Sequence, residues 1–235
     1  MYGFLYFYLR FMIYSMLGFL IETVSILINY KRISLHRGFF IGPYLPIFGF
    51  GGIIINYGLA KYENDLLALF ILSMVFCTIL EYLSSYILEK IFKLRWWNYY
   101  DKKFNLNGRV CLQNAIGFGV ASIFVLKIFN PVVFGFIDSL SKTTIMTISI
   151  VLMIIFIIDM MVTLYTLIKL QLNTQEYFHK DATKAIKKEI KENFKKHSFL
   201  YRRIFKSYPS ITKDNKNIKD IENIVSKEAN NDERK

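Results

Sequence analysis

Residues 95–111 read RWWNYYDKKFNLNGRVC, a polar, aromatic and basic stretch in a chain that is otherwise largely apolar. The apolar segments on both sides of it are each long enough to cross about 30 Å of hydrocarbon at about 1.5 Å per residue of helix. A stretch between two such segments has to lie at or beside a membrane surface. This stretch therefore marks where the chain leaves the membrane between two spans, and most of the functional hypotheses below concern its residues.

The composition predicts an all-α, polytopic transmembrane helix bundle. Of the 235 residues, 54% are hydrophobic and 17% are aromatic, and the mean hydropathy is +0.32, which is more apolar than ordinary soluble domains. About five segments are long enough to span the membrane, namely 4–29, 38–60, 66–92, 110–130 and 143–170. Segment 132–140 is apolar but too short to span, so it is either an interfacial turn or half of a sixth, re-entrant element.

The basic residues predict the orientation. All but four of the 30 Lys and Arg residues fall in 31–37, 90–109 or 169–235, the exceptions being Arg10, Lys61, Lys127 and Lys142. The positive-inside rule then predicts an N-terminus outside and a C-terminus in the cytoplasm, and it explains the net charge of +12 without a nucleic-acid partner. The many Lys, Ile, Asn, Tyr and Phe residues are typical of an AT-rich bacterial genome, so we expect a bacterial plasma membrane.

Three parts follow one another along the chain. Residues 1–172 form the predicted transmembrane domain, 173–208 a basic amphipathic cytoplasmic helix, and 209–235 a disordered charged tail. The amphipathic helix is predicted from apolar residues that recur among Lys and Arg, at Phe178, Ala182, Ile186, Ile190 and Phe194. This helix lies either on anionic lipid of the inner leaflet or against the protein's own loops.

The second apolar segment begins with RGFFIGPYLPIFGFGG, residues 37–52. Pro43 and Pro46 each remove a backbone donor, so we expect the helix to be kinked or partly unwound here. One interpretation is a packing kink in which Gly38 and Gly42 form a close helix contact. The other is a broken helix that lines a cavity facing the cytoplasm.

Three acidic residues, Glu22, Glu81 and Asp159, fall inside the predicted spans. Each costs roughly 2.5 to 3.5 kcal/mol at the bilayer centre, so such residues usually face the bundle interior. Helical spacing aligns them with small polar residues, which predicts three polar seams that face one another: Ser15, Gly18, Ser25 and Asn29 with Glu22; Ser73, Cys77 and Ser84 with Glu81; Thr163 and Thr166 with Asp159.

Two hypotheses compete for Glu22 and Glu81. As structural residues they would be buried ion-pair partners that fix helix register, with Arg37, Arg95 or Arg109 as the cation. As functional residues they would bind a cation, a proton or the polar group of a substrate.

Within the opening stretch, Trp96 and Trp97 suit an aromatic belt at the membrane surface. Asn105, Asn107 and Gly108 favour a turn with positive backbone dihedrals. Arg95 and Arg109 flank this turn as donors for carboxylate or phosphate. Such a loop would clamp a lipid headgroup, contact a partner subunit or cap a cavity.

No sequence pattern predicts a metal, a cofactor or an enzyme. The three histidines are scattered, and Cys77 and Cys111 lack the spacing of a metal site or an obvious disulfide. The sequence contains neither a GxxxxGK[ST] phosphate-binding loop nor a recognisable catalytic triad.

Several motifs occur in a recognisable order: Gly18 four residues before Glu22, RGFFIGPYLPIFGFG at 37–51, EYLSSYILEKIF at 81–92, RWWNYY at 95–100 and FNLNGRVCL at 104–112. Together they resemble the bacterial integral membrane family described as "putative ABC-transporter type IV", also called CmpB-like, over roughly residues 11–129. In that family's pattern Asp follows the tryptophan pair, whereas this chain has Asn98.

The resemblance implies a permease-like subunit of a transporter, and the family name does not specify a substrate. Because the chain lacks its own ATP-binding loop, a separate ATPase would dock on the cytoplasmic face, with residues 95–109 as the platform. The alternatives are a structural membrane scaffold and a membrane-embedded lipid- or headgroup-binding enzyme. In such an enzyme Glu22 and Glu81 would be acid and base, and the arginines would hold phosphate.

Overall fold

Four long apolar helices make up most of the computed structural model, which describes residues 1–30, 40–92 and 96–179. Three of them are α1 (Tyr2–Tyr30), α3 (Leu66–Phe92) and α6 (Lys142–His179), and the fourth runs from Leu112 to Asp138. Each is long and apolar enough to cross a membrane. The predicted all-α, polytopic bundle is confirmed.

The second apolar segment is not a full span, so the expected number of about five spanning helices falls to four in the described part of the chain. Helix α2 covers only Pro46–Ile53 and continues as a π-helical turn, Ile54–Gly58, which gives a length of about 20 Å. Residues 40–45 are not helical. Pro46 lies in the first helical turn, where its missing N–H costs nothing. The predicted unwinding near the two prolines is therefore confirmed.

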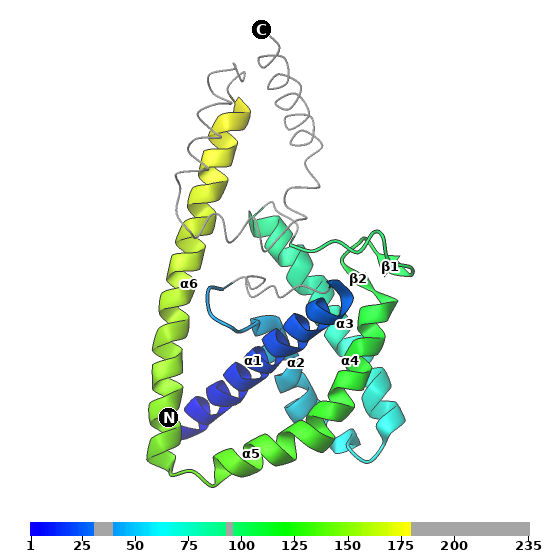
Figure 1. The fold of residues 1–235 in the computed structure, drawn as a ribbon, viewed down its shortest axis with the longest axis vertical. Helices are drawn as coiled ribbons and strands as arrows, with labels where there is room; N and C mark the ends of the chain where they lie inside the picture. The colour runs from blue at the N-terminus through cyan, green and yellow to red at the C-terminus, as the bar shows by residue number, and fades with distance from the viewer. Residues whose placement is uncertain (31–39, 93–95, 180–235) are drawn as a thin grey trace.

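The fourth long helix corrects two other expectations. Segments 110–130 and 132–140 belong to one bent helical run, so 132–140 is no separate re-entrant element. The run consists of α4 (Leu112–Phe124), a π-helical turn (Val125–Phe129) and α5 (Asn130–Asp138). Pro131 lacks an N–H and crowds the carbonyl four residues earlier, and the widened turn just before it absorbs this disruption. Figure 1 shows α5 turning away from α4 and running to the start of α6.

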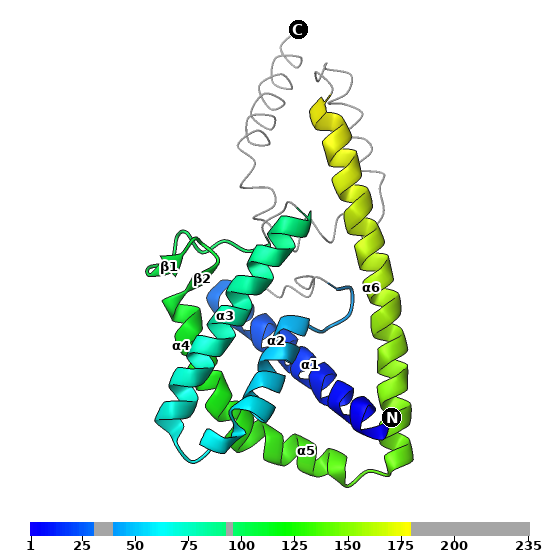
Figure 2. The ribbon, with the colours of Figure 1, turned by 180° about the vertical axis from the view of Figure 1, so that it is seen from behind.

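A short antiparallel hairpin connects α3 to α4. Its strands are β1 (Asn105–Leu106) and β2 (Val110–Cys111), with Asn105 opposite Cys111. Asn107 and Gly108 form the turn with φ of 55° and 66°, as expected for an Asn-Gly hairpin. Figures 1 and 2 show the hairpin at the end of the bundle where α3 ends, projecting sideways from it.

Helices α1 and α2 pack closely because glycines remove side chains between them. A Cβ on Gly52 would lie 2.3 Å from Cγ of Tyr14, and one on Gly18 would lie 2.2 Å from Cβ of Phe48. Small residues allow this backbone approach in membrane bundles. The contact expected from Gly38 and Gly42 is not the one observed, since Gly42 lies in the non-helical stretch and Gly38 lies outside the described residues.

Arg10, one of the isolated basic residues, joins α1 to α5 near the opposite end of the bundle. Its Nη2 donates a hydrogen bond to the Tyr6 hydroxyl at 2.8 Å, and the Tyr6 hydroxyl donates in turn to the Asp138 carboxylate. Its guanidinium also lies 4.3 Å from the ring centre of Phe134. The charge is therefore held by aromatic and polar groups of two helices.

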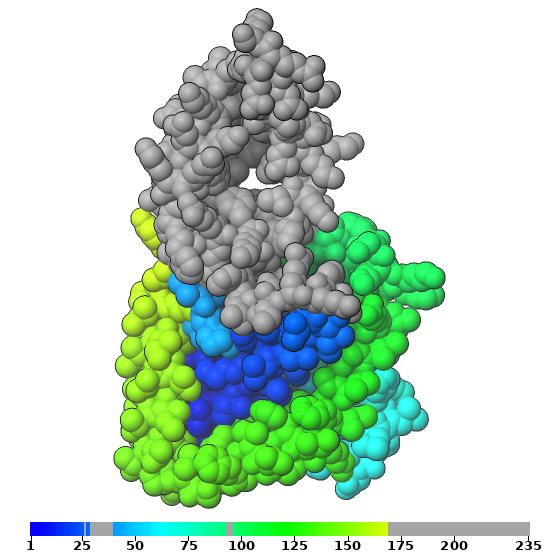
Figure 3. Space-filling model, in the orientation of Figure 1, coloured from blue at the N-terminus to red at the C-terminus, as the bar shows by residue number. Residues whose placement is uncertain are grey.

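Helix α6 continues past its apolar part, which ends at Ile168, to His179. The predicted amphipathic helix, 173–208, begins inside α6, and residues 180–235 lie outside the described residues. Figure 3 shows α6 and α5 framing α1 on one face of the molecule.

Candidate functional site

A buried carboxylate holds the non-helical stretch that precedes α2. Asp159, on α6, is 8% exposed. Its Oδ1 accepts the backbone N–H of Ile41 at 2.9 Å, and its Oδ2 accepts that of Gly42 at 2.7 Å. The hydroxyls of Tyr44 and Thr163 also donate to this carboxylate, Thr163 at 3.0 Å. Asp159 thus caps two backbone donors that no helix satisfies.

The same stretch is tied to α1 as well. The backbone N–H of Leu45 donates to the carbonyl of Ser15 at 2.9 Å. The rings of Phe40 and Tyr44 pack on Phe156 of α6, with centroids 5.0 and 5.6 Å apart. Non-helical backbone inside a membrane persists only where protein or trapped water satisfies it, and here α1 and α6 do so. The seam of Asp159 therefore faces residues 41–45 rather than the seam of Glu81.

Glu81 lies in a second polar cluster, between α3, α4 and the loop that carries the hairpin. It is 6% exposed. Its Oε1 accepts the Tyr99 hydroxyl at 3.2 Å and the Asn114 amide at 3.3 Å. Its Oε2 is buried and has no hydrogen-bond partner among the residues that the structure describes. This oxygen has the capacity to accept a further donor or a cation.

Glu22 approaches this cluster from α1. It is half-buried, and its negative charge is one of the causes that raise the pKa of Tyr99. Burial is the largest cause of that higher pKa, followed by the charge of Glu81, while a hydrogen bond with Asn114 acts in the opposite direction. Tyr99 therefore remains a protonated donor to Glu81. The predicted partners Arg37 and Arg95 lie outside the described residues.

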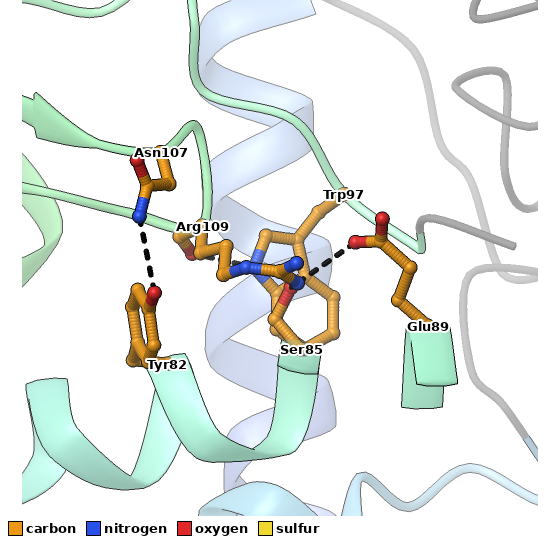
Figure 4. Close-up of polar contacts among 6 residues, drawn as sticks. All are labelled: Tyr82, Ser85, Glu89, Trp97, Asn107 and Arg109. Atoms are coloured by element: carbon orange, nitrogen blue, oxygen red, sulfur yellow. Dashed lines mark hydrogen bonds and ion pairs between the residues drawn. The ribbon is translucent and has the colours of Figure 1, made fainter. Parts of the chain in front are cut away.

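Arg109 pairs with Glu89, so the predicted pairing of Arg109 with Glu22 or Glu81 is wrong. Nη1 of Arg109 lies 2.8 Å from Oε2 of Glu89 and donates to Oγ of Ser85 at 3.2 Å. The guanidinium also lies 5.7 Å from the ring centre of Tyr82 and 5.5 Å from that of Tyr86. Figure 4 shows this arginine reaching from the loop to the last turns of α3. Ser85 and Glu89 lie one and two turns after Glu81 on α3, so the guanidinium of Arg109 lies past Glu81.

Other predicted site residues build the loop itself. Trp97 Nε1 donates to the carbonyl of Arg109 at 2.8 Å, and the Asn107 amide donates to the Tyr82 hydroxyl at 3.1 Å (Figure 4). The Asn105 side chain donates to the carbonyl of Lys102 at 2.8 Å and accepts the N–H of Gly108 at 3.1 Å.

Trp96 is 4% exposed and packs edge-on against Phe92. It is therefore part of the protein interior, not of a lipid-facing belt.

Asn98 performs a turn function that an aspartate can also perform. Its Oδ1 accepts the backbone N–H of Tyr100 at 2.9 Å, and either an amide or a carboxylate oxygen makes this bond. A Cβ on Gly108 would lie 2.8 Å from the same oxygen. Asn at this position therefore keeps the local geometry.

Four polar partners carry no signal in the sequence pattern and are brought together only by the tertiary structure. These are Ser85, Glu89, Tyr99 and Asn114. Helical spacing selected Ser84, but Ser85, one turn after Glu81, is the buried serine, at 2% exposure. Glu89 lies near the end of a span, where a carboxylate costs little free energy, so its presence there does not indicate a buried or functional residue.

A family model described as "Putative ABC-transporter type IV" matches residues 9–164 of the chain. Searches of curated proteins and of solved structures gave no match.

Proposed function

The chain belongs to the family described as "Putative ABC-transporter type IV", and from this we propose that it is a permease-like subunit of a transporter that relies on a separate ATPase. Its long apolar helices and its family make it a transporter-related, multi-pass membrane protein. The permease role, the partner and the orientation are our proposal. We propose a bacterial plasma membrane, with the N-terminus outside and the C-terminus in the cytoplasm.

One observation carries the proposal: α2 with its π-helical turn is only about 20 Å long, against about 30 Å for a full span, and a buried carboxylate holds the stretch before it. Asp159 bonds to the backbone of Ile41 and Gly42 from another helix. Transporters commonly bind their substrates beside such discontinuous helices. Because Asp159 joins the break to α6 through hydrogen bonds, we propose that the break moves together with α6.

The polar cluster around Glu81 supports the same proposal. We propose that Glu22 and Glu81 contact a cation, a proton or the polar group of the substrate. The support is the buried Oε2 of Glu81, which has no donor in the described part of the chain. An unsatisfied carboxylate oxygen inside a membrane is costly, so such oxygens generally serve a ligand or a partner side chain. Arg37 and Arg95 remain the candidate side-chain partners.

We propose a separate ATPase because the family is described as ABC-transporter type and the sequence has no phosphate-binding loop of its own. We propose that it docks on the end of the bundle where α3 ends and the loop before α4 lies, which is cytoplasmic in the proposed orientation. The ion pair of Arg109 with Glu89 joins this loop to the last turns of α3, and we propose that movements of the docked ATPase reach the membrane helices through it. Anionic lipid is the proposed partner of residues 173–208.

The alternative of a headgroup-binding enzyme has less support. Of the arginines considered for its phosphate, Arg109 already bonds to Glu89 and Ser85, while Arg37 and Arg95 lie outside the described residues.

Affinity purification of the chain from native membranes in a mild detergent tests the proposal. We expect an ATPase to co-purify, with a turnover that depends on this chain. A chain that purifies without an ATPase but with a tightly bound lipid would support the alternative.

A further inference from the structure

The tip of the hairpin loop, residues 100–106, presents three large apolar side chains to the outside. Tyr100 is 61% exposed, Phe104 80% and Leu106 59%. Lys102 and Lys103 are exposed beside them. The tip therefore combines aromatic, aliphatic and cationic groups on one small projection.

The backbone of the tip includes a residue in an unfavourable conformation. Phe104 has φ of +53°, a conformation that residues other than Gly, Asn and Asp rarely adopt. Its carbonyl accepts the N–H of Leu112 at 3.2 Å, and the side chain of Asn105 closes the turn on Lys102 and Gly108. Strained residues of this kind tend to occur at functional surfaces. Here the strain holds an aromatic ring away from the protein.

The tip lies at the level of a membrane surface. The apolar helix before it ends at Phe92, and the apolar helix after it begins at Leu112, so the loop between them, residues 93–111, leaves the hydrocarbon and returns to it. Figures 1 and 2 show the hairpin extending sideways from the helices, and Figure 3 shows it projecting beyond its neighbours. A sideways projection at this level meets the lipid headgroups that surround the bundle.

We propose that the hairpin tip is a membrane-surface anchor for an anionic leaflet. Phe104, Leu106 and Tyr100 enter the boundary between headgroups and acyl chains, as aromatic residues do at interfaces. Lys102 and Lys103 bind the negative charge of the lipid headgroups. The salt bridge of Arg109 with Glu89 ties the base of the hairpin to α3. This inference goes beyond the proposed transport function and does not depend on it.

A depth measurement on the full-length chain tests the proposal. The native Cys77 and Cys111 are replaced by Ala, and a single cysteine is introduced by Phe104→Cys and labelled with an environment-sensitive fluorophore. The protein is reconstituted in phosphatidylcholine vesicles with or without phosphatidylglycerol. We expect quenching of the label by nitroxide-bearing lipids, protection from aqueous iodide, and stronger quenching by lipid when phosphatidylglycerol is present.

Two controls make the result specific. Asp101→Cys labels an exposed residue of the same turn and should be quenched more by iodide than the label at 104. Adding Lys102→Gln and Lys103→Gln to Phe104→Cys should remove the effect of phosphatidylglycerol. Leu106→Cys replaces Phe104→Cys if the latter lowers the thermal stability of the chain.

Equal iodide quenching at 101 and 104 would overturn the proposal. Protection of position 104 only when a co-purified protein is present would overturn it too, and would make the tip a protein contact.

Discussion

Asp159 and Gly42 are 117 residues apart in the sequence, yet Oδ2 of Asp159 accepts the backbone N–H of Gly42 at 2.7 Å. The contact joins the middle of the last long helix to the break before α2. A buried carboxylate that caps backbone donors inside a membrane bundle has few substitutes, because such donors need a partner from the protein or from trapped water. This relationship is the structural basis of the proposed permease role, and it leads to the first prediction.

Asp159→Asn should destabilise the chain. The amide keeps one acceptor oxygen but directs an NH2 group at backbone donors, which leaves buried N–H groups unpaired at about 1 to 3 kcal/mol each. We expect a lower thermal midpoint in detergent, measured by size-exclusion chromatography of a fluorescent fusion. Thr166→Val is the matched control, because the Thr166 hydroxyl donates only within its own helix, to the carbonyl of Val162. Equal midpoints for the two variants would contradict the assigned role.

Arg109→Gln should loosen the loop from α3. It removes the salt bridge to Glu89 and the hydrogen bond to Ser85. The side chains of Arg109 and Glu89 are 11% and 32% exposed. Breaking a partly buried pair of this kind costs roughly 1 to 3 kcal/mol. The double variant with Glu89→Gln should cost less than the sum of the two single variants, as a double-mutant cycle of thermal unfolding would show.

The exposed pair of Lys127 and Glu63, 3.3 Å apart and 36% and 45% exposed, supplies the control. Lys127→Gln should change the free energy of unfolding by no more than about 1 kcal/mol. If Arg109→Gln changed the free energy of unfolding no more than Lys127→Gln does, the attachment of the loop to α3 would not depend on Arg109.

Glu81→Gln should leave the abundance of the protein normal and abolish its activity. Glutamine keeps an acceptor for the Tyr99 hydroxyl and the Asn114 amide, so the fold loses little, whereas the negative charge proposed to serve the substrate disappears. Membrane abundance by immunoblot and ATP turnover of the purified complex are the two measurements. Reduced abundance would instead indicate a buried ion pair with an arginine. Tyr99→Phe, which removes one neutral donor, should affect turnover less.

Gly52→Ala should separate α1 from α2. The added Cβ would lie 2.3 Å from Cγ of Tyr14, and overpacking in a close contact costs roughly 1 to 3 kcal/mol. Gly117→Ala is the control, because a Cβ there meets nothing within 4 Å. A thermal midpoint that falls for Gly52→Ala but not for Gly117→Ala is the expected result. No difference between them would mean that the two helices do not need this close approach.

Local pattern predicted the parts of the fold that depend on local physics. Long apolar runs predicted the helices, two prolines predicted the break near 40–45, and Asn107 with Gly108 predicted the turn. Segment 132–140 was predicted as a separate short element because of its length, whereas a wider helical turn before Pro131 joins it to the preceding helix, and sequence spacing does not show such a turn. The predicted amphipathic helix and the orientation stay predictions.

Long-range pairing was the part that could not be predicted. The sequence offered several carboxylates as partners of Arg109, and only the tertiary structure, which places the Arg109 side chain beside the last turns of α3, selects Glu89. The role of Asp159 was equally hidden, because its partners are backbone groups that carry no sequence signal. Glu81 was identified correctly as a buried acidic residue, since its burial follows from its place in an apolar helix.

The most direct test of the central claim is the ATP turnover of the complex retained on the affinity-tagged chain after extraction in a mild detergent. The account predicts an ATPase in constant ratio to the chain, with a turnover that falls when the chain is removed or carries Glu81→Gln. An ATPase that is absent, or whose rate is the same with and without the chain, would contradict it.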